Sequence, residues 1–213
     1  LWNSQEGPLG GVNVNFAFYT YAYFVIGIFV NGLRIPWAIA SKILYFSLFL
    51  VLGIFSIHRL LTTVFEKSSA WQIAIGALLY TTNTYILLVA SGGQMGIALA
   101  YSLAPFVLAK TIELATLRNP FTTSLVLGLS LAVQVVFDIR IAYLTIVACG
   151  IYVLINWIRI GVAFRRSLKY YCIAGLLVVL LHAFWVVPFY AFDLLTVPKN
   201  ITTVDSFDFF SFA

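Results

Sequence analysis

Long and nearly uncharged apolar segments are the feature that most restricts how this chain can fold. A helix needs roughly 20 apolar residues, within a range of about 17 to 25, to cross a bilayer. Six segments reach or approach that length: Trp37 to Ile57, Trp71 to Ala90, Met95 to Ile112, Thr122 to Phe137, Ile141 to Ile158, and Tyr170 to Tyr190. They predict an all-α fold, a polytopic bundle of about six transmembrane helices.

The composition agrees with a membrane location. Of the 213 residues, 62% are hydrophobic and 9% are charged, whereas a soluble domain carries roughly 25% charged residues. There is too little polar surface to cover a water-soluble globule, so the lipid bilayer is the expected partner. The net charge of +5 does not indicate nucleic-acid binding, because basic residues in membrane proteins mainly set orientation.

The basic residues predict which side of the membrane each connection faces. Eight of the twelve Lys and Arg residues lie in the first, third and fifth connections between the six segments: Arg59, Lys67, Lys110, Arg118, Arg159, Arg165, Arg166 and Lys169. Because basic loops stay in the cytoplasm, these connections are expected inside the cell. The remaining connections then face outside, as do five of the seven acids (Glu6, Asp138, Asp193, Asp205 and Asp208). We therefore expect a multi-pass plasma-membrane protein with its active face outside the cytoplasm.

This orientation divides the chain into three parts. Residues 1–36 form a first outer loop, 37–190 the transmembrane bundle, and 191–213 the start of a further outer loop. The segment Phe16 to Val30 opens with "FAFYTYAYF", and such aromatic clusters favour the membrane–water interface. We favour an outer interfacial helix here; the alternative is a seventh span, which would place residues 1 to 15 in the cytoplasm.

The stretch "VVFDIRIAYL" places Asp138 and Arg140 between two apolar segments. A charge at the bilayer centre costs at least about 2.5 kcal/mol, so we expect both residues at an outer turn, where they reach water or each other. One interpretation is a surface ion pair that stabilises the turn, worth about 0 to 1 kcal/mol. The other is functional: Asp138 activates an acceptor hydroxyl or holds a metal ion, and Arg140 binds a phosphate through its planar fork of donors.

Two further outer segments contain candidate residues. The loop "SGGQMG" (Ser91 to Gly96) has glycines that permit close backbone approach to a ligand, which makes Gln94 a candidate substrate-binding residue; the alternative is a short turn. Glu6 is the acid of the leading segment, and a solvated glutamate is the alternative there. The sequence has no His/Cys metal cluster, and His182 is expected to make a hydrogen bond between helices.

Several of these stretches resemble one family. "LWNSQEGPLGG" is similar to the first outer loop of polytopic GT-C glycosyltransferases, and "NGLRIPWAIASKI" to the start of their second transmembrane helix. "AIGALLYTTNTYILLVASGG" followed by "ALAYSLAPFVL" resembles a pattern of the large arabinofuranosyltransferases and of bacterial membrane proteins that glycosylate lipoteichoic acid. The resemblance extends over the whole chain through degenerate apolar patterns.

The resemblance implies an inverting transferase that moves a sugar from a polyprenyl-phosphate donor to a glycan or lipid acceptor on the outer face. In that family an acid of the first outer loop deprotonates the acceptor hydroxyl. This acid follows the first helix, so we expect the chain to be a fragment that lacks both. Trp2 and Asn3 become candidate substrate-binding residues, and Glu6 a secondary catalytic candidate. Some members require a divalent metal such as Mg²⁺ or Mn²⁺ and others do not, so the cofactor stays undefined.

The alternative function is a multi-pass transporter, or a flippase for lipid-linked sugars, without transferase activity. Such proteins show internal repeats, broken helices or ionisable residues at the middle of the membrane. The sequence shows no internal repeat, and its charges lie near helix ends. These observations favour the transferase.

Overall fold

The protein is described by a computed structural model that places residues 2–3, 11–12, 30, 32–36, 39, 42–65, 67–92, 94–117, 119–160 and 162–191. Nearly all of these residues are helical, which confirms the predicted all-α class. The exception is a pair of two-residue strands, β1 (Trp2–Asn3) and β2 (Gly11–Val12), which pair antiparallel with Trp2 opposite Val12. The predicted interfacial segment and residues 192–213 lie outside the described residues, apart from Val30.

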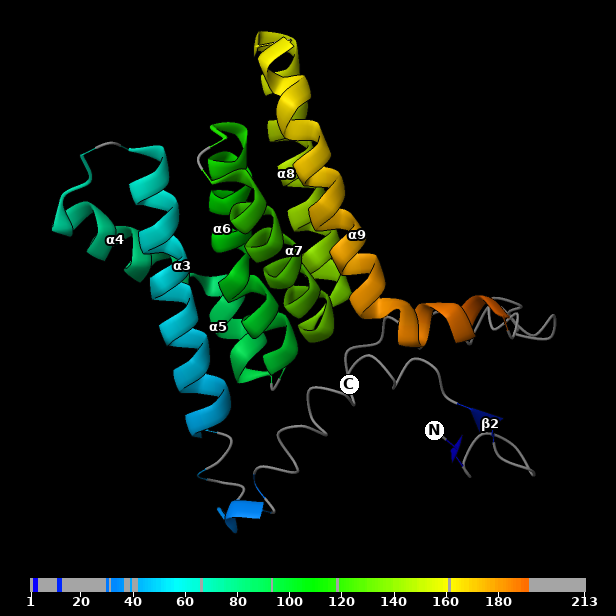
Figure 1. Cartoon of the computed structure of the whole chain (residues 1–213). Coiled ribbons are helices and arrows are strands. Elements are labelled where there is room, and N and C mark those ends of the chain that lie inside the picture. Colours follow the sequence, from blue (N-terminus) through cyan, green and yellow to red (C-terminus); the bar gives the residue numbers. More distant parts are fainter. Residues whose placement is uncertain are drawn as a thin grey trace, which may run out of the picture.

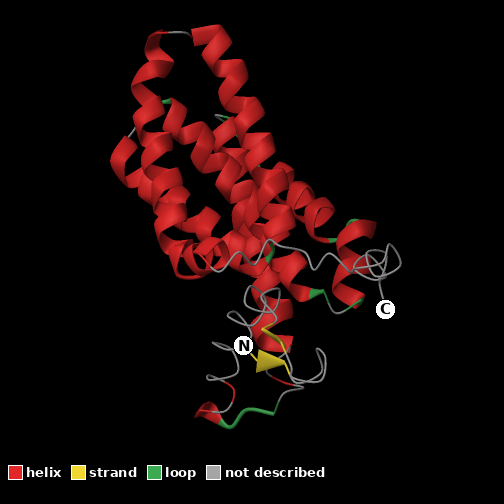
Figure 2. Cartoon of the chain, turned by 90° about the vertical axis from the view of Figure 1, so that its right-hand side faces the viewer, coloured by secondary structure: helices red, strands yellow, loops and turns green. Residues whose placement is uncertain are grey.

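The described helices pack into one bundle (Figures 1 and 2). In chain order they are the π-helical η1 (Lys42–Ser47), α3 (Leu48–Val64), α4 (Ala70–Thr81), α5 (Thr84–Ser91), α6 (Met95–Ala115), α7 (Pro120–Phe137), α8 (Ile139–Ile160) and α9 (Val162–Ala191). The bounds of α6, α7 and α8 lie within three residues of the predicted segments, and the start of α6 and the end of α7 match the prediction. The helix α3 ends seven residues later than predicted, and α9 begins eight residues earlier.

The predicted number of six spans is not reproduced. Three described helices are long and apolar enough to cross a membrane: α6, α7 and residues Ile139–Ile158 of α8. The pair α4 and α5 adds a fourth if the two are counted as one bent span. The other two apolar helices, α3 and residues Ser167–Ala183 of α9, are shorter. The chain is therefore a membrane protein with three such helices, or up to four, in its described part.

The second predicted segment is broken in two. The helices α4 and α5 meet at an angle of 48°, because Asn83 caps α5 and does not continue α4. The Asn83 side-chain oxygen accepts from the Ile86 N–H at 3.1 Å, while its amide nitrogen donates to the Tyr80 carbonyl at 2.8 Å and to the Tyr101 hydroxyl at 2.9 Å. Asn side chains often compete with the helix backbone in this way.

The first predicted segment continues beyond its expected end at Ile57. The helix α3 runs on through His58 and Arg59 to Val64. Thr62 and Thr63 donate their hydroxyls to carbonyls of the preceding turn, and Arg59 forms an ion pair with Glu113 of α6. These contacts give partners to Arg59, Thr62 and Thr63, which the sequence analysis had placed in the connection after the helix.

The helix α6 forms the centre of the bundle and packs against α3, α7 and α8. Over its membrane-spanning window 56% of α6 is buried, against 17% of α8, so α8 lies at the periphery. Gln134 of α7 donates to the Ala100 carbonyl of α6 at 2.9 Å and to the Thr145 hydroxyl of α8 at 2.8 Å. As expected, buried His182 of α9 bonds across helices, to the Ala132 carbonyl of α7 at 3.1 Å.

The alternation of helix directions places the basic connections together. Figure 1 shows the C-terminal ends of α3, α6 and α8 at one end of the bundle, and the C-terminal ends of α5 and α7 at the other. We call the first the basic end and the second the Asp138 end. This agrees with the expectation that the three basic connections share one side.

Candidate functional site

Asp138 lies between α7 and α8 and is almost fully buried, with 1% of its surface exposed. Its Oδ1 accepts from the backbone N–H groups of Arg140 at 2.8 Å and Ile141 at 3.2 Å. These are first-turn donors of α8 that have no partner within the helix, so Asp138 is the N-cap of α8. Asp138 therefore stabilises the turn, as one of the two sequence-based hypotheses proposed, by capping α8.

Arg140 completes the contacts of this carboxylate. Its Nη2 donates to Asp138 Oδ2 at 2.8 Å, and its Nε to Oδ1 at 3.3 Å. The side chain of Arg140 is 57% exposed, whereas that of Asp138 is fully buried. Buried Asp138 thus holds the Nε and Nη2 edge of the guanidinium in one orientation at the end of the bundle.

The glycine-rich junction between α5 and α6 adjoins this turn. A Cβ built on Gly96 would lie 2.8 Å from the Phe137 carbonyl oxygen, so only glycine permits this approach. Met95, Ile97, Phe137 and Ile141 also belong to one apolar cluster. Gln94 is half-buried and precedes the first residue of α6, where its side chain makes no capping bond. The fold therefore brings Gln94, Asp138 and Arg140 to the same end of the bundle.

The candidate residues of the first outer loop are not joined to this site. Trp2 and Asn3 form β1, and the structure describes only their pairing with β2. Glu6 lies outside the described residues. The roles predicted for these three residues therefore stay predictions.

The described residues offer no arrangement suited to a divalent metal. No group of three His, Cys, Asp or Glu side chains with ligand spacing occurs in the described part of the chain. The two oxygens of Asp138 already accept four hydrogen bonds, from Arg140 and Ile141. The described residues at this end therefore do not fit the Mg²⁺ or Mn²⁺ ion that the family resemblance allows.

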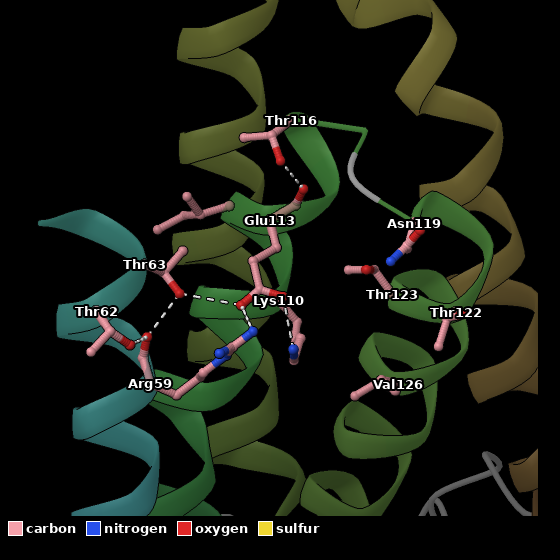
Figure 3. A pocket seen from close by; sticks show the side chains of 11 residues that line it. Arg59, Thr62, Thr63, Lys110, Glu113, Thr116, Asn119, Thr122, Thr123 and Val126 are labelled. Atoms are coloured by element: carbon pink, nitrogen blue, oxygen red, sulfur yellow. Dashed lines mark hydrogen bonds and ion pairs between the residues drawn. The ribbon is translucent and has the colours of Figure 1, made fainter. Parts of the chain in front are cut away.

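A second polar site, which the sequence analysis missed, lies at the basic end. Glu113 of α6 binds Arg59 Nη2 of α3 at 2.7 Å and Lys110 Nζ at 2.8 Å (Figure 3). The signal in the sequence is an acid three residues after Lys110, at an end of the bundle where basic residues outnumber acids. Its pairing with Arg59, 54 positions earlier, depends on how α3 packs against α6.

Comparisons with known proteins identify no relative for these sites. No protein-family model matches the chain, and no curated protein or solved structure is similar enough to count as a match.

Proposed function

We propose that the chain belongs to a membrane glycosyltransferase of the GT-C type that takes a sugar from a polyprenyl-phosphate donor. The observation that carries the proposal is the exposed guanidinium of Arg140, fixed by buried Asp138 at the end of the bundle. An arginine held in this way suits a phosphate. A guanidinium can make two parallel charge-assisted hydrogen bonds to a phosphate, and these bonds fix both the position and the orientation of the phosphate.

In this proposal Arg140 binds the phosphate of the donor at the outer membrane interface, and the polyprenyl chain extends along apolar helix surfaces. An acceptor hydroxyl attacks the anomeric carbon, the bond from that carbon to the phosphate oxygen breaks, and polyprenyl phosphate leaves with inversion. The charge of Arg140 stabilises the leaving phosphate. A carboxylate takes the hydroxyl proton, and Glu6 is the candidate within this chain.

The contacts of Asp138 suggest that it contributes by positioning Arg140. Its four hydrogen bonds come from residues of its own turn, and its side chain is fully buried. The role as a base that the sequence suggested requires an oxygen that faces the acceptor, so we assign proton transfer to another acid. Gln94, at the same end, is proposed to contact the sugar or the acceptor.

The test of this proposal is turnover. Full-length protein in lipid vesicles is incubated with a panel of radiolabelled polyprenyl-phosphate sugars and an acceptor extract, with and without EDTA. We expect label to move from the lipid to the acceptor, and Arg140→Gln to abolish the transfer. A folded protein that leaves every labelled donor unchanged would refute the proposal.

The outward orientation has its own test. Single cysteines at Lys67 or Thr116 mark the basic end, and a cysteine at Gln94 marks the other; Cys149 and Cys172 are first replaced by alanine. A membrane-impermeant maleimide added to intact cells should label Gln94→Cys alone. Labelling of the basic-end cysteines alone would place Gln94, Asp138 and Arg140, which we call the Arg140 site, on the cytoplasmic side.

A flippase for lipid-linked sugars is the second candidate, and one observation favours it. The span formed by α4 and α5 is broken, with a 48° bend and a polar cluster of Tyr80, Asn83 and Tyr101 at the break. Broken membrane helices are typical of transporters, where they surround the substrate site. Transfer of label to an acceptor separates the enzyme from the flippase.

A further inference from the structure

A polar cavity of about 600 Å³ opens at the basic end of the bundle, between α3, α6 and α7. Ligand pockets in proteins range from about 300 to 1,000 Å³, so this volume is sufficient for a substituted phosphate. Nine of the eleven described residues that line it are polar, among them Arg59, Lys110, Glu113, Asn119 and Thr122. The cavity is therefore suited to a polar ligand at the edge of the membrane.

Its charges favour an anion. Arg59 and Lys110 supply two positive charges, and Glu113 one negative charge. The carboxylate is already paired with Arg59 Nη2 at 2.7 Å and Lys110 Nζ at 2.8 Å. The Thr63 hydroxyl oxygen lies 3.2 Å from it and divides its one proton between Glu113 and the Arg59 carbonyl. A guanidinium has five N–H donors and an ammonium three, more than the ion pairs of Arg59 Nη2 and Lys110 Nζ with Glu113 use. The remaining donors can bind a ligand.

The first turn of α7 faces these cations across the cavity (Figure 3). Asn119 precedes the helix and makes no side-chain capping bond, and Pro120 has no N–H. The N–H groups of Phe121 and Thr122 belong to the first turn, where no helix carbonyl is available to them. The positive end of an 18-residue helix and the Thr122 hydroxyl therefore add donors to those of Arg59 and Lys110.

We propose that this cavity binds a phosphate group, at a site separate from the Arg140 site and at the opposite end of the bundle. Three independent features converge on one anion: the two cations from α3 and α6, the uncapped start of α7, and the hydroxyl and amide side chains between them. A cation is disfavoured, since Glu113 is the single acid among the described lining residues and is already paired twice.

The location indicates a phospholipid headgroup as the source of the phosphate. The cavity lies at the ends of α6 and α7, two of the helices long enough to cross a membrane. Eight of the twelve Lys and Arg residues of the chain lie in or near the connections at this end, and basic segments attract anionic lipids. A soluble phosphate ester has the same recognition chemistry, so the experiment includes both sources.

The test measures ligand binding by native mass spectrometry of full-length protein in a neutral detergent. The probes are dioctanoyl phosphatidic acid, dioctanoylglycerol as its phosphate-free match, and inorganic pyrophosphate. Arg59→Gln and Thr122→Glu alter the cavity, while Lys67→Gln makes the same change in charge on the α3–α4 connection outside it. A glutamate at position 122 lies in the first turn of α7, where an acid stabilises a helix, so this variant tests binding without threatening the fold.

We expect phosphatidic acid to bind at least tenfold more tightly than dioctanoylglycerol. Arg59→Gln and Thr122→Glu should each weaken that binding at least fivefold, and Lys67→Gln less than twofold. If pyrophosphate does not compete with phosphatidic acid, the ligand is a lipid headgroup. If pyrophosphate competes effectively, the ligand is a soluble phosphate ester. Either result supports a phosphate site. Equal binding of the two lipids, or an equal loss in Lys67→Gln and Thr122→Glu, would overturn the inference.

Discussion

Gly96 of α6 lies against the Phe137 carbonyl at the end of α7, at a distance that leaves no room for a Cβ atom. Asp138 follows Phe137 directly and holds Arg140. The contact of Gly96 with Phe137 therefore fixes the α5–α6 junction beside the turn that contains Arg140, the residue proposed to bind the donor phosphate. Two segments about 40 positions apart in the sequence form one site through this contact.

Replacing Gly96 by alanine should destabilise the protein. The added Cβ would lie 2.8 Å from a backbone oxygen, so the helices must shift, at a cost of about 1 to 3 kcal/mol in the free energy of unfolding. Gly150→Ala is the matched control, because nothing lies within 4 Å of its Cβ position and alanine favours a helix by up to about 1 kcal/mol. Thermal unfolding in detergent measures both; a loss of equal size in the two variants would show that the contact is unimportant.

Two substitutions of Asp138 distinguish a role in positioning Arg140 from a role in removing the proton of the acceptor. Asp138→Ala removes the N-cap of α8 and should cost about 0.5 to 2 kcal/mol of stability. Asp138→Asn keeps an oxygen that accepts from the Arg140 and Ile141 N–H groups, so most of the stability should remain while the ion pair with Arg140 is lost.

If Asp138 acts through Arg140, Asp138→Asn should raise KM for the polyprenyl-phosphate donor several-fold with a smaller effect on kcat. Steady-state kinetics of the purified full-length protein measure this difference. A normal donor KM with kcat close to zero would instead assign to Asp138 the role of the base.

Asn83 should be necessary for the break between α4 and α5. Its side chain makes three hydrogen bonds there, two to backbone groups and one to the Tyr101 hydroxyl. Asn83→Ala removes all three and should lower the free energy of unfolding by about 1 to 2 kcal/mol. Thr82→Ala is the control, because the exposed Thr82 hydroxyl bonds only the Leu78 carbonyl of its own helix, and the expected change is within about 0.5 kcal/mol. Indistinguishable unfolding curves would exclude a structural role for Asn83.

The positions of α6, α7 and α8 could be predicted from the sequence because these apolar segments have clear ends. Met95 and Phe137 bound α6 and α7 as predicted, and the basic connections meet at one end. The break at Asn83 has a local signal, the polar run Thr81 to Thr84, which the length criterion for a span ignored. The cap made by Asp138 also has one, an acid directly before an apolar helix.

The contacts between helices could not be predicted in the same way. Arg59, in the part of α3 that extends past Ile57, forms an ion pair with Glu113 of α6, and nothing in either local sequence identifies the partner. The approach of Gly96 to Phe137 likewise arises from the packing of α6 against α7. Such pairs are set by tertiary structure, and both the Arg140 site and the phosphate cavity depend on them.

The most direct test of the proposed function follows one labelled donor in sealed vesicles that contain the full-length protein. A polyprenyl-phosphate sugar with label in the sugar is placed in one leaflet, and acceptor is supplied on the side that the Gln94 label defines as outer. We predict labelled acceptor together with an equal amount of free polyprenyl phosphate, and neither product with Arg140→Gln. Intact donor that appears in the opposite leaflet, without any free polyprenyl phosphate, would contradict the transferase and identify a flippase.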